Sequence, residues 1–183
     1  YISVNGVQTC ALPISDLTVP PEALGGFVTA FAAGSGDFLN GTRLELPRER
    51  GAMPLLNAIA NTFFARALSF ALGTPLSDTL CGTKSFPRAE LARIQRLSST
   101  ISRSDPFGDF ELLLPAAALG LGIVNIPVQY RKRRYGSTKI SRVRHGLLLL
   151  RLTARALVAL TLGAAPIRRK PPYDGGRPGG AGH

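Results

Sequence analysis

The chain has 183 residues, with 45% hydrophobic and 18% charged side chains, and these values are typical of a globular protein of about one domain. Its formal net charge of +11 predicts an anionic partner, which is a phospholipid surface, a phosphorylated substrate or a nucleic acid. Two cysteines and two histidines are too few for a disulfide framework or a histidine-based zinc site.

Residues 1–15 differ from the rest of the chain, because the run GVQTCALPI at residues 6–14 resembles the translation of a sequencing-adapter oligonucleotide. The run has neither helical nor strand periodicity, and no basic segment precedes an apolar core as in a signal peptide. We therefore expect residues 1–15 to be a foreign scar, and we leave them out of the predicted fold. This interpretation also predicts that the natural protein begins upstream and that the chain is a C-terminal fragment.

The first half of the remaining chain predicts two helices and one strand. Pro21 and Glu22 suit the first turn of a helix that ends before Gly34. Apolar residues then recur at helical spacing from Leu55 to Phe70. The predicted elements are a helix at 21–33, a short strand at 37–43 and a long helix at 51–72.

The second half continues the alternation of helices and strands. Residues 76–86 are expected to be irregular, because small and polar side chains dominate there. The last residues contain Pro171, Pro172 and five glycines, which predicts a disordered tail at 166–183. The predicted elements are a short helix at 87–96, a polar loop at 98–104, a buried helix at 109–121, a strand at 122–130 and a helix at 140–164. This alternation predicts an α/β fold.

Two motifs before residue 50 carry residue types that bind phosphate or metal. Asp16 precedes a helix, where a carboxylate can ligate a divalent cation, although a single aspartate there is most often a helix cap. The run Asn40-Gly41-Thr42-Arg43 combines a glycine that allows close backbone approach with an arginine whose fork of donors suits a phosphate. A plain surface turn is the alternative for this run.

Three further motifs follow. The loop from Asp78 to Lys84 has small residues and ends in a cation, which is typical of a substrate-contacting loop. Asp109 and Glu111 begin an apolar helix, where carboxylates can take a proton, bind a hydroxyl or only complement the helix dipole. A basic run at 130–139 suits a diphosphate or a lipid phosphate, and a solvated basic face is the alternative; its polar residues include Arg134, Ser137 and Lys139.

The order and spacing of these motifs resemble the second half of a family-2 glycosyltransferase, with the polyprenyl- or dolichyl-phosphate mannosyltransferase type as the nearest likeness. The resemblance covers residues 16–153. It is carried by Asp16-Leu17-x-x-Pro20-Pro21-Glu22, Gly41-Thr42-Arg43, Cys81-Gly82-Thr83-Lys84, Gly108-Asp109-Phe110-Glu111 and Tyr135-Gly136-Ser137-Thr138-Lys139.

The resemblance implies that residues 16–141 are the C-terminal part of a GT-A domain, an α/β domain that binds a nucleotide-sugar donor with a divalent cation, Mg or Mn. The implied reaction is an inverting displacement onto a lipid phosphate or another acceptor. Where the family has the first aspartate of its Asp-x-Asp metal motif, this chain has Ile14, so we expect the fragment alone to be inactive. The implied site residues are Asp16 for the metal, Asp109 and Glu111 for catalysis, and Arg43, Lys84, Arg134, Ser137 and Lys139 for substrate binding.

Residues 142–165 are expected to form an amphipathic helix at an anionic membrane surface. Arg151 and Arg155 share one helical face, whereas Leu147, Leu150 and Ala154 can share another. A spanning helix would bury two arginines at about 2.5–3.5 kcal/mol each, so an interfacial helix is favoured. Packing of the helix against the domain is the alternative.

Charge distribution sets the expected location and the rival function. Twelve of the 22 Lys and Arg residues lie between Glu111 and Asp174, where no acidic residue occurs. We expect a peripheral protein at the cytoplasmic face of a membrane. The alternative to a glycosyltransferase is a basic, non-catalytic module that binds lipid or nucleic acid. Nucleic acid is not the expected partner, because the basic run contains few aromatic residues and matches no nucleic-acid-binding motif.

Overall fold

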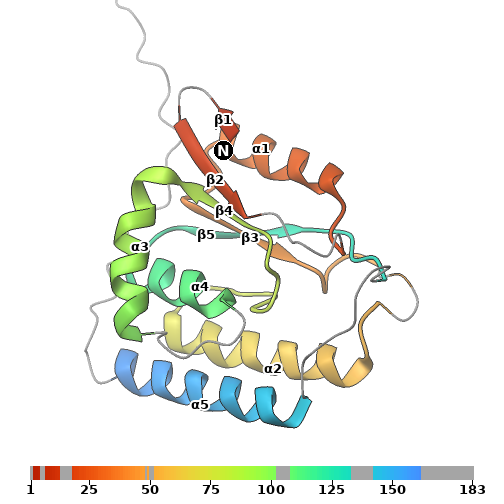
Figure 1. Ribbon diagram of the computed structural model, residues 1–183, viewed down its shortest axis with the longest axis vertical. Coiled ribbons are helices and arrows are strands. Elements are labelled where there is room, and N and C mark those ends of the chain that lie inside the picture. Colours follow the sequence, from red (N-terminus) through yellow and green to blue (C-terminus); the bar gives the residue numbers. More distant parts are fainter. Residues whose placement is uncertain are drawn as a thin grey trace, which may run out of the picture.

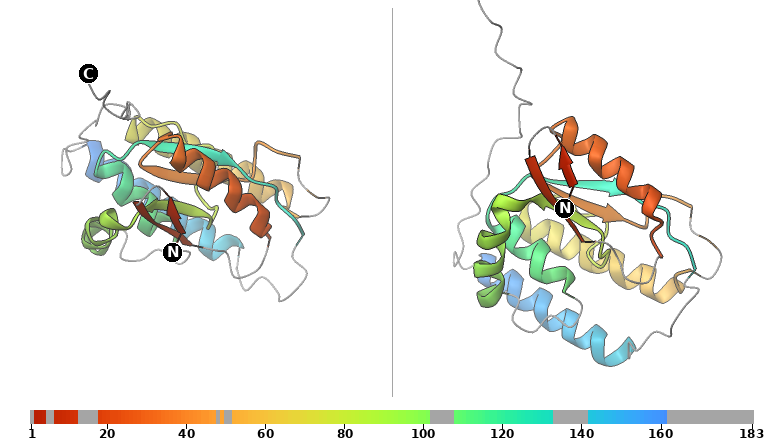
Figure 2. Two further views of the ribbon diagram at one scale, coloured as in Figure 1. Left: turned by 90° about the horizontal axis from the view of Figure 1, so that it is seen from above. Right: turned by 45° about the horizontal axis from the view of Figure 1, so that its top comes forward.

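The computed structural model describes residues 2–4, 7–12, 18–47, 49, 52–101, 108–132 and 142–161. A five-stranded sheet lies between helix α1 on one face and helices α2, α3, α4 and α5 on the other (Figures 1 and 2). The elements in chain order are β1 (Ile2–Val4), β2 (Val7–Leu12), the 3-10 turn η1 (Pro21–Ala23), α1 (Leu24–Ala32), β3 (Phe38–Thr42), α2 (Leu55–Leu72), β4 (Lys84–Pro87), α3 (Arg88–Ile101), α4 (Asp109–Ala118), β5 (Ile123–Pro127) and α5 (Arg142–Thr161).

The sheet has the strand order β1-β2-β4-β3-β5. Strands β3 and β5 are parallel, in register from Phe38 opposite Ile123 to Thr42 opposite Pro127. The other neighbouring pairs are antiparallel, and β4 starts where β3 ends, with Lys84 opposite Asn40. The carboxyl ends of β3 and β5 and the start of β4 therefore meet at one edge of the sheet.

Two apolar cores cover the two faces of the sheet, because side chains alternate along each strand. Phe38 points into the larger core, which α2, α3, α4 and α5 cover, and its ring stacks on that of Phe86 with centroids 5.4 Å apart. The next residue, Leu39, points into the smaller core beneath α1, where it meets Phe27. The predicted α/β fold is thus present, and each buried strand supplies both layers.

Most predicted helices and strands are present close to the predicted positions. Helix α2 begins at Leu55 behind Pro54 and ends before Gly73, whose φ of 61° lies in the left-handed region that glycine tolerates. Helix α4 is buried along most of its length, as predicted. The predicted tail at 166–183 lies outside the described residues.

One prediction about strands is wrong. The end of the segment 76–86, expected to be irregular, belongs to β4, whose Phe86 is fully buried. Residues 1–15, which were left out of the predicted fold, contain β1 and β2, and β2 pairs with β4 from Leu12 opposite Lys84 to Thr9 opposite Pro87. Strand pairing uses backbone groups, so it needs no side-chain periodicity in the added strand. The foreign origin of residues 1–15 stays a prediction.

Helix α5 is present, but its faces differ from the prediction. Leu149 and Leu152 are buried against the domain, so one face of the helix packs on the domain, which was the alternative to a membrane-surface helix. Leu147 and Leu150 lie on the exposed side together with Arg151, rather than opposite it. Apolar and basic side chains therefore share the outer surface of α5.

Candidate functional site

Five polar side chains from separate elements gather near the edge of the sheet at which β3 ends. We call them the polar cluster, and they are joined by two ion pairs. The segment between α2 and β4 connects the two pairs, because Asp78 of the first pair lies in it and Lys84 of the second pair follows it as the first residue of β4. The members of the polar cluster are Arg43, Asn61, Asp78, Lys84 and Asp109.

Asp78 is the centre of the first pair and is fully buried. Its carboxylate accepts hydrogen bonds from Arg43 Nε at 2.7 Å, from Arg43 Nη2 at 2.9 Å and from the Arg43 backbone N–H at 3.1 Å. Asn61 Nδ2 donates at 2.6 Å and the Leu80 backbone N–H at 2.9 Å. A buried charge that is paired and fully hydrogen-bonded in this way fixes the loop relative to β3 and α2.

Burial and pairing compete in setting the ionisation of this pair. Burial alone would raise the pKa of the Asp78 carboxyl, but the hydrogen bonds and charge of Arg43, with the bond from Asn61, outweigh it and hold that pKa below its ordinary value. Burial likewise opposes the charge of Arg43, yet the Asp78 carboxylate raises the pKa of the guanidinium above its ordinary value. Both groups are charged at neutral pH, as an ion pair requires.

Arg43 was predicted to bind substrate phosphate. In the structure two of its guanidinium nitrogens are directed at Asp78, and the guanidinium lies 5.1 Å above the centre of the Tyr130 ring. The side chain is 12% exposed. Arg43 therefore links the end of β3 to the loop and to the segment after β5, and its role toward a substrate stays a prediction.

The second pair joins Lys84, the first residue of β4, to Asp109, the first residue of α4. Lys84 Nζ lies 2.8 Å from Asp109 Oδ1 and also donates to the carbonyl oxygen of Cys81. The Lys84 side chain is fully buried, whereas that of Asp109 is 12% exposed. The buried cation of Lys84 therefore holds the Asp109 carboxylate in place, and the catalytic role of Asp109 stays a prediction.

Asp109 and Glu111 were predicted to act together. Both lie in the first turn of α4, but residues two apart are about 200° apart around a helix and do not face each other. Asp109 forms an ion pair with Lys84. The structure therefore brings Asp109 into the polar cluster, and it directs Glu111 to another side of the helix.

Gly41 makes a close backbone contact inside the protein. Its N–H donates to the Thr83 carbonyl oxygen at 2.8 Å, and a Cβ atom at this position would lie 2.9 Å from Cys81 Sγ and 2.9 Å from that same oxygen. The close neighbour is the loop that leads to Lys84. A glycine at this point lets β3 and the loop approach each other.

Gly41→Ala is therefore expected to lower the free energy of unfolding by about 1–3 kcal/mol, because the added methyl group overpacks a buried contact. Gly25→Ala is the control, since a Cβ at this position of α1 has no heavy atom within 4 Å and should stabilise the helix by about 0.5–1 kcal/mol. Urea denaturation of both variants measures the difference. Equal stabilities would contradict the tight contact at Gly41.

The first residues of the basic run lie beside Thr18, which follows Asp16 by two residues. The Arg131 backbone N–H donates to the Thr18 carbonyl oxygen at 2.8 Å, and Glu49 accepts from the Lys132 backbone N–H at 2.6 Å. The backbone N–H of Val128, the residue after β5, donates to the carbonyl oxygen of Thr42 at the end of β3, at 2.9 Å. Three motifs distant in the sequence therefore converge where β3 and β5 end.

Four predicted site residues lie outside the described residues, namely Asp16, Arg134, Ser137 and Lys139. Among the residues that the structure describes, no three His, Cys, Asp or Glu side chains gather as ligands for a metal ion. The described part of the chain therefore offers no complete metal site, and the metal role of Asp16 stays a prediction.

Sequence reasoning missed the residues that organise the polar cluster. Asn61 is buried on the inner face of α2, and its Oδ1 accepts from the Thr79 hydroxyl at 3.0 Å and from the Thr79 backbone N–H at 3.1 Å. An asparagine on the face that carries Ala58, Ala65 and Leu68 was the available signal, since a buried amide needs polar partners. Asp78 was noticed only as the first residue of a loop.

Comparison with known proteins gives one match of note. Over 125 residues, or 68% of this chain, the sequence is 34% identical to the dolichyl-phosphate hexose transferase of Haloferax volcanii. The chain spans about half the length of this relative, 50%. No family profile matches the chain, and no solved structure gives a significant match. The similarity supports a glycosyltransferase-like relationship and gives no support to the alternative of a non-catalytic binding module.

Proposed function

We propose that this chain is part of an inverting glycosyltransferase of family 2. The proposed enzyme moves a sugar from a nucleotide-sugar donor to a polyprenyl phosphate, as a peripheral protein at the cytoplasmic surface of a membrane. The proposal takes its acceptor from the name of the relative in Haloferax volcanii. It takes its fold, a partial GT-A domain, from the resemblance of the ordered motifs.

The convergence of the predicted motifs at one edge of the sheet is the observation that carries the proposal. Thr18 follows Asp16 by two residues, and its carbonyl oxygen accepts from the N–H of Arg131, which opens the basic run. Arg43 connects this point to Asp78 and through the loop to Lys84. In open α/β sheets, ligands bind outside the carboxyl ends of parallel strands. Strands β3 and β5 are parallel, and their carboxyl ends lie where the motifs converge.

The proposed reaction is a single displacement. A phosphate oxygen of the acceptor forms a bond to the anomeric carbon while the bond from that carbon to the nucleoside diphosphate breaks, so the configuration inverts. A phosphate acceptor is already ionised, and the carboxylate of Asp109 then orients the reacting groups rather than removing a proton. The cations of the basic run stabilise the charge that develops on the diphosphate. A divalent cation at Asp16 remains part of the proposal, and no step depends on it here.

The experiment uses membranes that contain the full-length protein in which we expect this chain to occur. Radiolabelled GDP-mannose and UDP-glucose are supplied separately with a polyprenyl phosphate, and label in the lipid extract is counted. Transfer from one donor, with loss of transfer when EDTA removes divalent cations, is the expected result. Absence of lipid-linked label with both donors, from protein that is folded, would count against the proposal.

A further inference from the structure

Glu49, in the loop between β3 and α2, contacts the start of the basic run at two points. Its backbone N–H donates to the Tyr130 carbonyl oxygen at 3.2 Å, and its carboxylate Oε2 accepts from the Lys132 backbone N–H at 2.6 Å. In a parallel ladder one residue likewise donates to the carbonyl before its partner and accepts from the N–H after it. Glu49 therefore continues the parallel pairing of β3 with β5 beyond the strand ends.

The acceptor in this continued pairing is a side chain. The backbone carbonyl of Glu49 accepts instead from the Ala52 N–H at 3.0 Å, and the carboxylate takes its place toward Lys132. A hydrogen bond to a carboxylate is stronger than one between neutral groups, because the acceptor is charged. The bond is made to the backbone, and the side chains of Arg131 and Lys132 are exposed. Two cations thus extend from a backbone segment that Glu49 holds in place.

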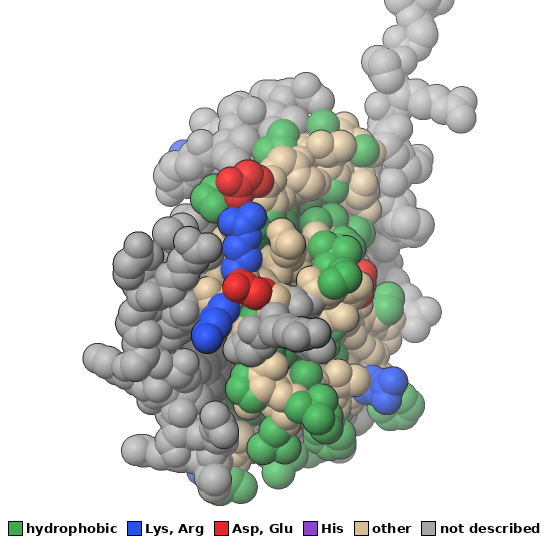
Figure 3. All heavy atoms as spheres, turned by 90° about the vertical axis from the view of Figure 1, so that its right-hand side faces the viewer, with side chains coloured by type: hydrophobic (Ala, Val, Ile, Leu, Met, Phe, Trp, Pro, Cys, Tyr) green, Lys and Arg blue, Asp and Glu red, His purple; other side chains and the backbone are tan. Residues whose placement is uncertain are grey.

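The segment that Glu49 holds also contacts the polar cluster. The Arg43 guanidinium lies 5.1 Å above the centre of the Tyr130 ring and is paired with Asp78. Figure 3 shows acidic and basic side chains alternating in a short column on the side of the molecule at which β3 and β5 end in Figure 1. Among the described residues that follow these two strands before α2 and α5, the exposed charged ones are Glu45, Glu49, Arg131 and Lys132.

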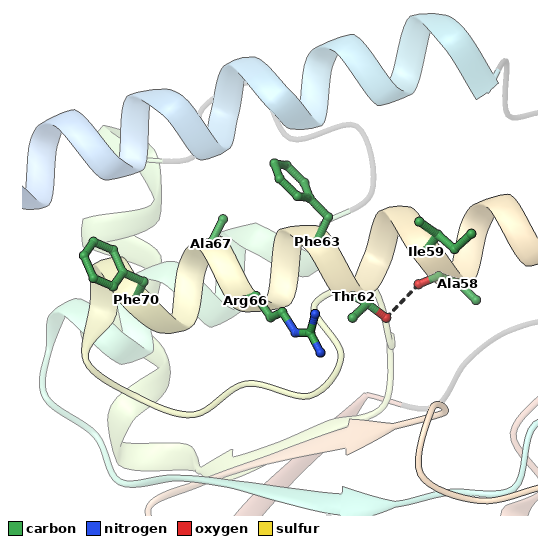
Figure 4. Close-up of a pocket in the computed structure, with 7 residues that line it drawn as sticks. All are labelled: Ala58, Ile59, Thr62, Phe63, Arg66, Ala67 and Phe70. Carbon is green, nitrogen blue, oxygen red and sulfur yellow. Dashed lines mark hydrogen bonds between the residues drawn. The ribbon is translucent and has the colours of Figure 1, made fainter.

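The open hollow along α2 is a separate feature of the surface. Its volume is about 690 Å³, and its lining includes Phe63, Arg66 and Phe70 but neither Glu49 nor a residue of the basic run (Figure 4). The lining carries one cation, Arg66, whereas two exposed cations lie side by side after β5. A phosphate group is therefore expected at the strand ends and not in the hollow.

We propose that Glu49 is a positioning residue of the proposed site, which fixes the backbone from Tyr130 to Lys132 so that the cations of Arg131 and Lys132 meet a diphosphate group of the substrate. The inference rests on the proposed function, which supplies the diphosphate. Charge alone predicts the opposite effect, because a carboxylate near two cations weakens their attraction for an anion. A residue that holds the cations in place strengthens binding, since less freedom is lost when the anion binds. The sign of the change on removing Glu49 therefore separates the two roles.

Hydrogen exchange of the Lys132 amide in the 183-residue chain tests the contact itself. In Glu49→Ala this amide should exchange at least about tenfold faster than in the native chain, because its acceptor is lost. Glu49→Gln keeps an oxygen that can accept, so the increase should be smaller. Glu45→Ala is the matched control, because Glu45 is an exposed carboxylate of the same loop, and exchange at Lys132 should not change.

Titration of the same chain with inorganic pyrophosphate tests the positioning role. Glu49→Ala should weaken the binding at least about fivefold although it removes a negative charge, and Glu49→Gln should retain most of the affinity. Arg131→Ala should weaken the binding as well, because it removes one of the two cations. Arg66→Ala is the control for this change, since it removes an exposed arginine at the hollow, and binding should stay as in the native chain.

Equal exchange of the Lys132 amide in the native chain and in Glu49→Ala overturns the inference. Pyrophosphate binding that is unchanged or tighter in Glu49→Ala also overturns it, as does the absence of saturable binding by the native chain. Glu49→Ser replaces Glu49→Ala if the alanine variant does not fold by circular dichroism. Neither measurement detects sugar transfer, so a native protein that binds pyrophosphate through Glu49 but transfers no sugar would contradict the proposed function alone.

Discussion

Asp78→Ala is expected to lower the free energy of unfolding by about 3–5 kcal/mol, because the change leaves the Arg43 guanidinium buried without its carboxylate. It also removes the acceptor for Asn61 and for the Leu80 N–H. Urea denaturation followed by circular dichroism measures the change. Glu90→Ala breaks an exposed ion pair with Arg93 and should cost less than about 1 kcal/mol, which makes it the matched control.

The double variant Asp78→Ala with Arg43→Leu separates the pair from the packing around it. Since it leaves no unpaired charge, the double variant should be more stable than the sum of the two single changes predicts. Strict additivity would contradict a buried ion pair.

The dependence of stability on pH follows from the sign of the Asp78 shift. The pKa of Asp78 is below its ordinary value of 3.8 in the folded protein, so the unfolded chain binds the proton first as the pH falls. The contribution of the pair is therefore complete above about pH 4 and is lost progressively below it. In Asp78→Asn, the free energy of unfolding should fall less steeply as the pH drops below about 4. The same steepness as in the native protein would mean that other carboxylates cause the acid unfolding.

Asp109→Asn is expected to reduce sugar transfer by the full-length protein at least about 100-fold while the protein stays folded, because the reacting groups lose the carboxylate that orients them. The amide retains the shape of the side chain but loses the negative charge beside Lys84. The effect should fall on kcat more than on KM if Asp109 acts on the reacting groups. Asp37→Asn is the matched control, because Asp37 lies before β3, at the opposite end of that strand from Arg43.

Lys84→Met distinguishes a positioning role from a structural one. Lys84 is fully buried and contacts Asp109, so its removal should reduce transfer through the orientation of that carboxylate. Restoration of transfer by Lys84→Arg would support positioning by charge. Normal kcat in Asp109→Asn would contradict the assignment of both residues.

The polar motifs of the candidate site were recognisable in the sequence, but their partners were not. Arg43, Lys84 and Asp109 were singled out from residue type and local context. The pairing of Lys84 with Asp109 depends on β4 and α4 meeting in space, and no local spacing encodes this contact between residues 25 apart. Asn61 and Asp78 were missed as site residues because each looks unremarkable locally, as a polar residue in a helix and the start of a loop.

The sequence by itself determined the helices and strands of strong periodicity, the excess of positive charge and the absence of acidic residues between Glu111 and Asp174. These features are local, and composition and spacing contain them completely. The tertiary structure decided which faces are covered. It buried Leu149 of α5 and left Phe63 and Phe70 of α2 exposed. It also paired β2 with β4 through backbone groups, and the side-chain pattern of β2 does not predict this pairing. It also decided that Arg43 faces Asp78, because a buried charge requires a partner and only the fold brings one within reach.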